Sequence, residues 1–148
     1  MSLQTDIIFV RAIRSNQELV AELPAGDVYN TAIALPEEDA MNAPVPYIIV
    51  SYDGMQNDQS TKDSYEGDTD QVTITIEVAA ETRDQLCNIM EAIRSTVLTF
   101  FESMQADPTE EGFPLLPLDY QLSASAVQFD SMKPCYWQTL TYVCDTNA

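Results

Sequence analysis

The chain has no histidine, only three cysteines and only four glycines among its 148 residues. Without histidine, a Ser-His-Asp or Cys-His catalytic site cannot form within one chain. The glycines are too scattered to build a loop that cradles phosphate; they stand at positions 26, 54, 67 and 112. We therefore expect a protein that is not an enzyme, with no catalytic residue and no cofactor.

The cysteines predict neither a disulfide framework nor a metal site. Their number is odd, and Cys135 and Cys144 stand near the two ends of one predicted strand. At roughly 3.3 Å per residue, these two thiols are about 30 Å apart and cannot pair within that strand. Cys87 falls in a predicted helix. Because the chain also lacks a C-x-x-C pair, no zinc site is expected. We expect three free, buried thiols.

Long apolar runs are missing too. No stretch approaches the roughly 20 apolar residues that span a bilayer. Residues 1–6 lack the basic and apolar regions of a secretory signal. The sequence thus predicts a soluble cytoplasmic protein that does not bind a membrane.

Basic residues are scarce, with 6 lysines and arginines against 24 acidic residues and a net charge of −18. A surface this negative repels phosphates, so specific nucleic-acid binding is disfavoured. The charge is concentrated in three loop-like stretches, residues 24–45, 53–70 and 105–119, which carry −4, −5 and −4. Adjacent carboxylates in these stretches are typical of solvated loops, because catalytic carboxylates need apolar surroundings to shift a pKa.

The clearest secondary-structure pattern in the sequence is a strand followed almost at once by a long helix. Residues 71–79 alternate apolar and polar side chains, the pattern of a strand with one buried face. Thr82 followed by Gln85 has the form of a capping box, which predicts a helix over residues 82–104. Its apolar residues form one broad stripe: Leu86, Ile89, Met90, Ile93, Val97, Phe100, Phe101 and Met104. The short connection folds this stripe back onto the strand.

The N-terminal third predicts helix and then two strands. Residues 5–23 are expected to be helical, with a break near Ser15 because Ser15 to Glu18 again has the form of a capping box. A short strand is expected over 28–35. The run 47–52 is apolar enough for a central strand with both faces covered.

A long polar stretch, residues 53–70, separates the second strand from the third. We expect an arm here, either a mobile loop or a protruding hairpin, because structureless loops of this length are commonly functional. An ion site is the alternative, although the spacing of the carboxylates does not fit an EF-hand. The candidate contacts with a partner or a second copy in this arm are Met55, Asp58, Lys62, Asp63 and Tyr65.

The chain closes with a predicted antiparallel hairpin over residues 120–144, with strands at 120–129 and 135–144. Trp137, the sixth candidate contact, belongs either to the core or to an interface. The expected fold is a single α+β domain over residues 1–148. A mostly antiparallel sheet of four to five strands would carry the N-terminal helix and the long helix on one face.

This order of elements resembles the tail-completion and tail-terminator proteins of long-tailed bacteriophages and prophages. The resemblance is carried by the "Val-Tyr" strand at 28–29, the proline-bracketed strand at 43–50, the polar loop and the 71–82 strand-to-helix junction. It runs along nearly the whole chain, although the 105–119 loop and the final hairpin match less closely.

Proteins of this family form rings, typically hexamers, that cap the tail tube where it meets the head connector. The resemblance implies that the partners are further copies of this chain, tail-tube proteins and head-connector proteins. It implies a place in the bacterial cytoplasm during assembly and in the tail of the virion, with DNA passing through the ring. Acidic loops at a channel would repel that DNA, and neighbouring copies would cover exposed strand edges.

The sequence leaves a second function open, from a different class. An acidic binding module, similar in action to an immunity or inhibitor protein, would mask a basic protein partner. The oligomeric state in solution separates the two hypotheses, because the ring requires several copies and the masking module requires only one.

Overall fold

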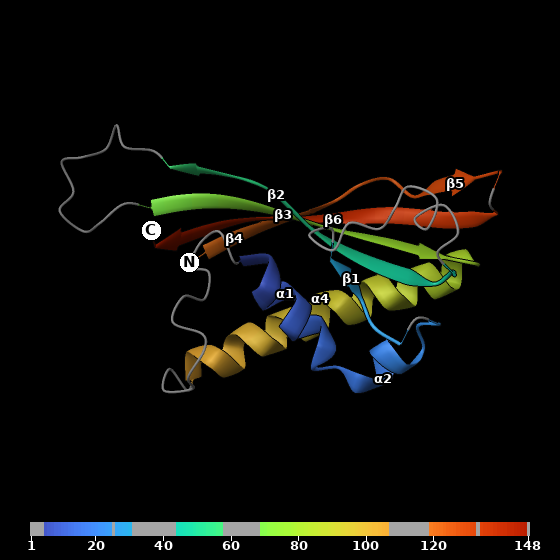
Figure 1. The fold of residues 1–148 in the computed structure, drawn as a ribbon, viewed down its shortest axis with the longest axis horizontal. Coiled ribbons are helices and arrows are strands. Elements are labelled where there is room, and N and C mark those ends of the chain that lie inside the picture. The colour runs from blue at the N-terminus through green and yellow to red at the C-terminus, as the bar shows by residue number, and fades with distance from the viewer. Residues whose placement is uncertain are drawn as a thin grey trace.

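The computed structural model describes residues 5–24, 26–30, 44–57, 69–106, 119–132 and 134–147 (Figure 1). Its helices and strands are, in chain order, α1 (Thr5–Arg14), α2 (Gln17–Ala21), β1 (Tyr29–Asn30), β2 (Tyr47–Asn57), β3 (Thr69–Ala80), α4 (Arg83–Ala106), β4 (Asp119–Ala124), β5 (Gln128–Asp130) and β6 (Cys135–Asn147).

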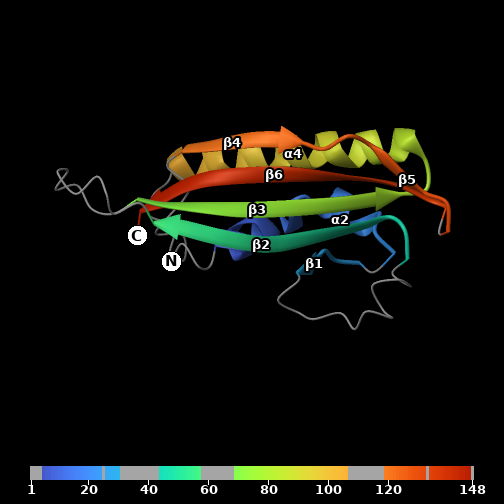
Figure 2. The same cartoon turned by 90° about the horizontal axis from the view of Figure 1, so that it is seen from above.

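The six strands form one sheet in the order β1-β2-β3-β6-β4, with β5 also pairing with β6. Every pairing is antiparallel except that of β1 with β2. Figure 2 shows the four long neighbours β2, β3, β6 and β4 side by side. The α+β class is confirmed, and the sheet has one strand more than the upper limit that we expected.

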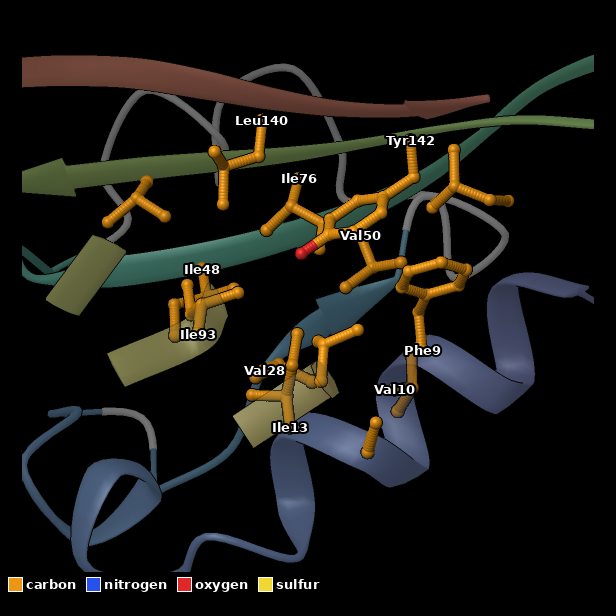
Figure 3. Close-up of a cluster of buried hydrophobic side chains, with 14 of the residues drawn as sticks. Phe9, Val10, Ile13, Val28, Ile48, Val50, Ile76, Ile93, Leu140 and Tyr142 are labelled. Carbon is orange, nitrogen blue, oxygen red and sulfur yellow. The ribbon is translucent and has the colours of Figure 1, made fainter. Parts of the chain in front are cut away.

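The three described helices lie on one face of the sheet (Figure 1). Along β3, the alternate residues Val72, Ile74, Ile76 and Val78 are fully buried, which confirms the period-two pattern. They pack against the apolar stripe of α4 and against α1 (Figure 3). The ring of Phe9 is fully buried in this core, against the rings of Phe101 and Tyr142.

The predicted start of the long helix is confirmed by its cap. The Thr82 hydroxyl accepts a hydrogen bond of 3.1 Å from the backbone N–H of Gln85. The Gln85 side chain in turn accepts one of 3.0 Å from the backbone N–H of Glu81. Both bonds satisfy donors that a helix start leaves unpaired. The helix ends at Ala106, two residues later than predicted.

The break between the first two helices is confirmed, but its cap is Asn16 and not Ser15. The Asn16 side chain accepts a hydrogen bond of 3.1 Å from the backbone N–H of Leu19. Ser15 donates instead to the carbonyl of Ala12 at 2.6 Å, so its hydroxyl is turned back into the first helix. The capping-box pattern therefore placed the break correctly and its cap one residue too early.

The predicted boundaries of the 53–70 arm are wrong at both ends. Strand β2 continues through Asn57 and β3 begins at Thr69, so part of the polar stretch belongs to the ladder. The register shifts between Tyr52 and Gly54, and Gly54 has a φ of +138°, which favours glycine. Polar residues can extend a strand because the backbone supplies the ladder bonds. The remainder of the arm, residues 58–68, lies outside the described residues.

Two other predicted strands differ from the structure. The 28–35 strand is described only at Tyr29–Asn30, and residues 31–35 lie outside the described residues. The 120–129 strand is interrupted between β4 and β5. At the interruption, the Ser125 hydroxyl accepts a hydrogen bond of 3.0 Å from the backbone N–H of Thr139. A serine side chain that binds backbone in this way competes with the regular ladder.

Candidate interaction surface

The face of the sheet away from the helices is not covered by any described element. Figure 2 looks onto this face, and no described helix lies over it. We call the alternate residues that point to this side the open face. They are Tyr47, Ile49, Ser51, Asp53, Gly54 and Gln56 of β2, Gln71, Thr73, Thr75, Glu77 and Ala79 of β3, Gln121 and Ser123 of β4, Gln128 and Asp130 of β5, and Cys135, Trp137, Thr139, Thr141, Val143 and Asp145 of β6.

An aromatic pair stands at one end of the open face. Tyr47, Ala79 and Trp137 are register partners on three neighbouring strands. Ala79 is fully buried, whereas the two aromatic residues beside it are partly exposed. The sequence predicted a strand covered on both faces around Tyr47; the helices cover one face, and Tyr47, Ile49 and Ser51 on the other face are half-buried. Trp137 lies outside the helix-side core, as an interface residue does.

A carboxylate holds the tyrosine of this pair in place. The Tyr47 hydroxyl donates a hydrogen bond of 3.2 Å to the carboxylate of Glu77. Burial raises the pKa of Tyr47 well above its usual value, and the negative charge of Glu77 acts in the same direction. The phenol is therefore a neutral hydrogen-bond donor at physiological pH, and it performs no acid–base chemistry there.

Strand β5 and the turn that follows it present two exposed apolar side chains that sequence reasoning missed. Phe129 is 55% exposed and Met132 is 95% exposed. The Phe129 ring packs against Tyr136 with the ring centroids 5.0 Å apart. Asp130 shapes the turn by accepting a hydrogen bond of 3.0 Å from the backbone N–H of Met132. The available signal was an apolar residue placed inside a polar turn.

The far end of β2 and β3 is tied by polar side chains. Asn57 donates a hydrogen bond of 2.6 Å to the carboxylate of Asp70, which is only 5% exposed. Further along the same two strands, the Thr75 hydroxyl donates a hydrogen bond to the carboxylate of Asp53 on the open face. Figure 1 shows this end of the sheet reaching beyond the start of α1. These bonds tie β2 to β3 within the stretch 53–70 that the sequence predicted to be an arm.

The structure does not bring the sequence-predicted contacts together. Met55 is 39% exposed and points to the helix side of the sheet, because its register partner Val72 belongs to the core. Trp137 pairs with Ala79, seven residues further along β3, or about 23 Å, and points to the open face. The other four candidates lie outside the described residues: Asp58, Lys62, Asp63 and Tyr65.

An open groove of about 580 Å³ runs between α2 and α4, and hydroxyl groups line much of it. The side-chain amide of Asn16 donates a hydrogen bond of 3.0 Å to the Thr96 hydroxyl beside the groove. The Ser95 hydroxyl donates a hydrogen bond of 2.9 Å to the carbonyl of Glu91. These bonds join the two helices and leave no arrangement of a nucleophile with a base among the described lining residues.

The three thiols are free, as expected, but only two are buried. Cys87 is exposed on α4, which corrects the prediction that all three are buried, whereas Cys135 and Cys144 lie inside. A helix buries only one side, and position 87 falls on the other. Burial raises the pKa of the Cys144 thiol to about 12. A thiol in that state is a poor nucleophile and metal ligand at neutral pH.

The described residues show neither a metal-binding cluster nor a membrane-spanning helix. Over the described ranges, no three side chains among His, Cys, Asp and Glu are grouped to hold a metal ion. No helix in the described part of the chain is long and apolar enough to cross a membrane. Comparison with protein-family models and with curated proteins found no match.

Proposed function

We propose that this protein is a structural subunit of a phage or prophage tail, acting in a tail-completion or terminator ring at the head–tail junction. The observation that carries the proposal is the one-sided layering of the fold. All described helices lie on one face, and no described element covers the opposite face or the outer edges of β4 and of residues 51–57 in β2. A protein that acts by assembly needs such surfaces and needs no catalytic group.

The negative charge of the open face is compatible with a position next to DNA to which the protein does not bind. The charged members of this face are Asp53, Glu77, Asp130 and Asp145, all of them carboxylates. A ring that turned this face toward its channel would repel the phosphates of the passing DNA. The electrostatic role of the face is then to prevent the passing DNA from binding to the wall of the channel.

The partners of the ring are further copies of this chain, the tail tube on one side and the head connector on the other. The partly exposed aromatic pair Tyr47 and Trp137 and the exposed Phe129 and Met132 lie toward the same end of β6. Exposed aromatic and methionine side chains are typical of interface cores. That end of the subunit is the better candidate for contact with a different tail protein.

The gene neighbourhood provides the most decisive test. We expect genes for a portal, a connector and a tail-tube protein beside this gene, and their absence contradicts the proposal. Where the prophage can be induced, deletion of the gene should leave headless tails, because no ring completes the tube. Electron microscopy of induced lysates measures this outcome. Normal, head-bearing particles in the deletion strain would also contradict the proposal, and restoring the gene on a plasmid is the control.

The alternative function is an acidic module that masks a basic partner. It is favoured by the same observation that the open face combines carboxylates with Tyr47 and Trp137, and that none of its members is lysine or arginine. Light scattering on purified protein separates the two proposals. A monomer at high concentration that forms a tight one-to-one complex with a basic protein supports the module. Self-assembled rings support the tail subunit.

A further inference from the structure

The sheet has two outer edges that no described strand covers. Strand β1 pairs only with Ile49 and Val50, so residues 51–57 of β2 have β3 on one side and no described strand on the other. Strand β4 pairs only with β6 over the described ranges. Such edges offer backbone N–H and C=O groups to another strand.

The two edges that no described strand covers lie at the same height in the sheet. Register partners can be followed across all four long strands from one edge to the other. One such row joins Ser51, Thr75, Thr141 and Ser123, and the row two steps along joins Gly54, Thr73, Val143 and Gln121. Residues 51–56 of β2 and residues 119–123 of β4 therefore span the same rows of the sheet.

The two edges also run in opposite directions. The pairings β2–β3, β3–β6 and β6–β4 are all antiparallel, so β4 is antiparallel to β2. A second copy can be placed beside the first with its helices on the same side of the sheet. The β2 edge of that copy then meets β4 in the antiparallel orientation, with almost no shift along the strands.

The side chains on these rows are compatible with such a junction. On the helix side, the partly buried Leu122 would stand opposite Tyr52 of the next copy. One pair along, Tyr120 would cover Met55, which is 39% exposed in the single subunit. On the open side, Ser123 would stand opposite Ser51, and no like charges face each other. The extra residue of the bulge, Asp53, divides the junction into two short paired segments.

We propose that copies of this chain join edge to edge, β4 of each copy pairing with residues 51–56 in β2 of the next. The inference rests on the proposed ring and specifies the contact that builds it. Because two different edges meet, the contact is head-to-tail, and a constant rotation between subunits closes it into a ring. The sheet becomes continuous from subunit to subunit, and the helices of all copies lie on one side of it.

Disulfide cross-linking tests this contact directly. Ser51 and Ser123 are directly opposite residues in the proposed junction, and Cβ atoms at such positions are about 4.5–5.5 Å apart, within reach of a disulfide after a small shift. The variant S51C/S123C is made in a Cys87→Ser background, because the Cys87 thiol is exposed. Mild oxidation at high protein concentration and high salt should give a ladder of covalent multimers on a non-reducing denaturing gel. Each single variant should stay monomeric.

A matched control replaces one of the two positions. In S95C/S123C the first cysteine is on the exposed side of α4, away from either edge. This pair should give no more covalent multimers than random collision produces. Circular dichroism should show that both double variants are folded. A ladder in S51C/S123C no stronger than in the control overturns the proposal. So does efficient dimerisation of S123C alone, because it would mean that two β4 edges pair around a two-fold axis.

The outcomes also separate this inference from the proposed function. If the gene lies among tail genes and light scattering finds rings, but no ladder forms, the edge contact is wrong and the tail role stands. If the ladder forms and the gene has no phage neighbours, the contact is right and the tail role is wrong.

Discussion

The side-chain amide of Asn57 donates a hydrogen bond of 2.6 Å to the carboxylate of Asp70, and the two residues are register partners at the end of the β2–β3 ladder. The Asp70 carboxylate is almost fully buried, so each donor that solvates it in place of water matters for stability. This pair anchors the two strands inside the stretch 53–70, which the sequence marked as an arm.

Replacing Asn57 with alanine should lower the free energy of unfolding by about 1–3 kcal/mol, because a buried carboxylate loses a hydrogen-bond donor. Urea denaturation followed by circular dichroism measures the change. Gln56→Ala is the matched control, since Gln56 is the exposed neighbour on the same strand and its change should stay within about 0.5 kcal/mol. Equal losses in the two variants would contradict a specific role for the Asn57–Asp70 pair.

The aromatic cluster of the core gives a second prediction. Phe9 is fully buried, and its ring centroid lies 4.8 Å from that of Tyr142 and 5.4 Å from that of Phe101. Phe9→Ala should cost about 3–5 kcal/mol of unfolding free energy through lost burial and the cavity left behind. Phe129→Ala removes the same side chain from a position that is 55% exposed and should cost much less. Thermal or urea unfolding of both variants checks the difference.

Stability should fall in alkaline solution. Burial raises the pKa of the Cys144 thiol from its usual 9.0 to about 12, and it raises the pKa of Tyr142 above its usual value. A group whose pKa is raised on folding stabilises the protein fully below the unfolded pKa and ceases to do so as pH rises through the folded pKa. Unfolding free energy should therefore decline from about pH 9 upward.

Urea titrations at a series of pH values measure this decline. In Cys144→Ala, stability at neutral pH should be lower because a buried side chain is truncated, and the decline between pH 9 and 12 should be shallower. Cys87→Ser should leave the profile unchanged, since Cys87 is exposed. An identical slope in wild type and Cys144→Ala would contradict the assignment of the decline to this thiol.

Thiol labelling tests the burial of the three cysteines independently. At pH 8 the folded protein should react through Cys87 alone, and the unfolded protein should react at all three positions. A colorimetric thiol assay counts the reactive groups before and after denaturant is added. Cys87→Ser should abolish the reaction of the folded protein, and rapid labelling of a second thiol without denaturant would contradict the buried positions.

Self-association should strengthen with salt. Each copy carries a net charge of −18, so copies that approach one another repel, and added salt screens that repulsion. The proposed edge junction depends on backbone hydrogen bonds and apolar contacts, which salt weakens little. Light scattering at low and high ionic strength should show a larger mass at high ionic strength. A mass that falls as salt is added would indicate that ion pairs hold the copies together.

The strand-to-helix unit was the most predictable part of the fold, because its signals are local. The alternation from Val72 to Val78 and the cap at Thr82 depend on residues within a few positions of one another, and both agree with the structure. The break near Ser15 was predictable for the same reason. Its cap moved to Asn16, whose side chain both accepts from Leu19 and donates to Thr96, 80 residues away along the chain.

The sequence by itself thus determined the class of the fold, its main helix and strand, and its acidity, because composition and periodicity are properties of neighbouring residues. Only the tertiary structure decided which residues meet. The continuation of β2 into polar sequence, the separation of Met55 from Trp137 and the alignment of Ser51 with Ser123 across four strands all depend on strand register. Register is set by how distant strands pack and pair, so no local pattern along the chain can specify it.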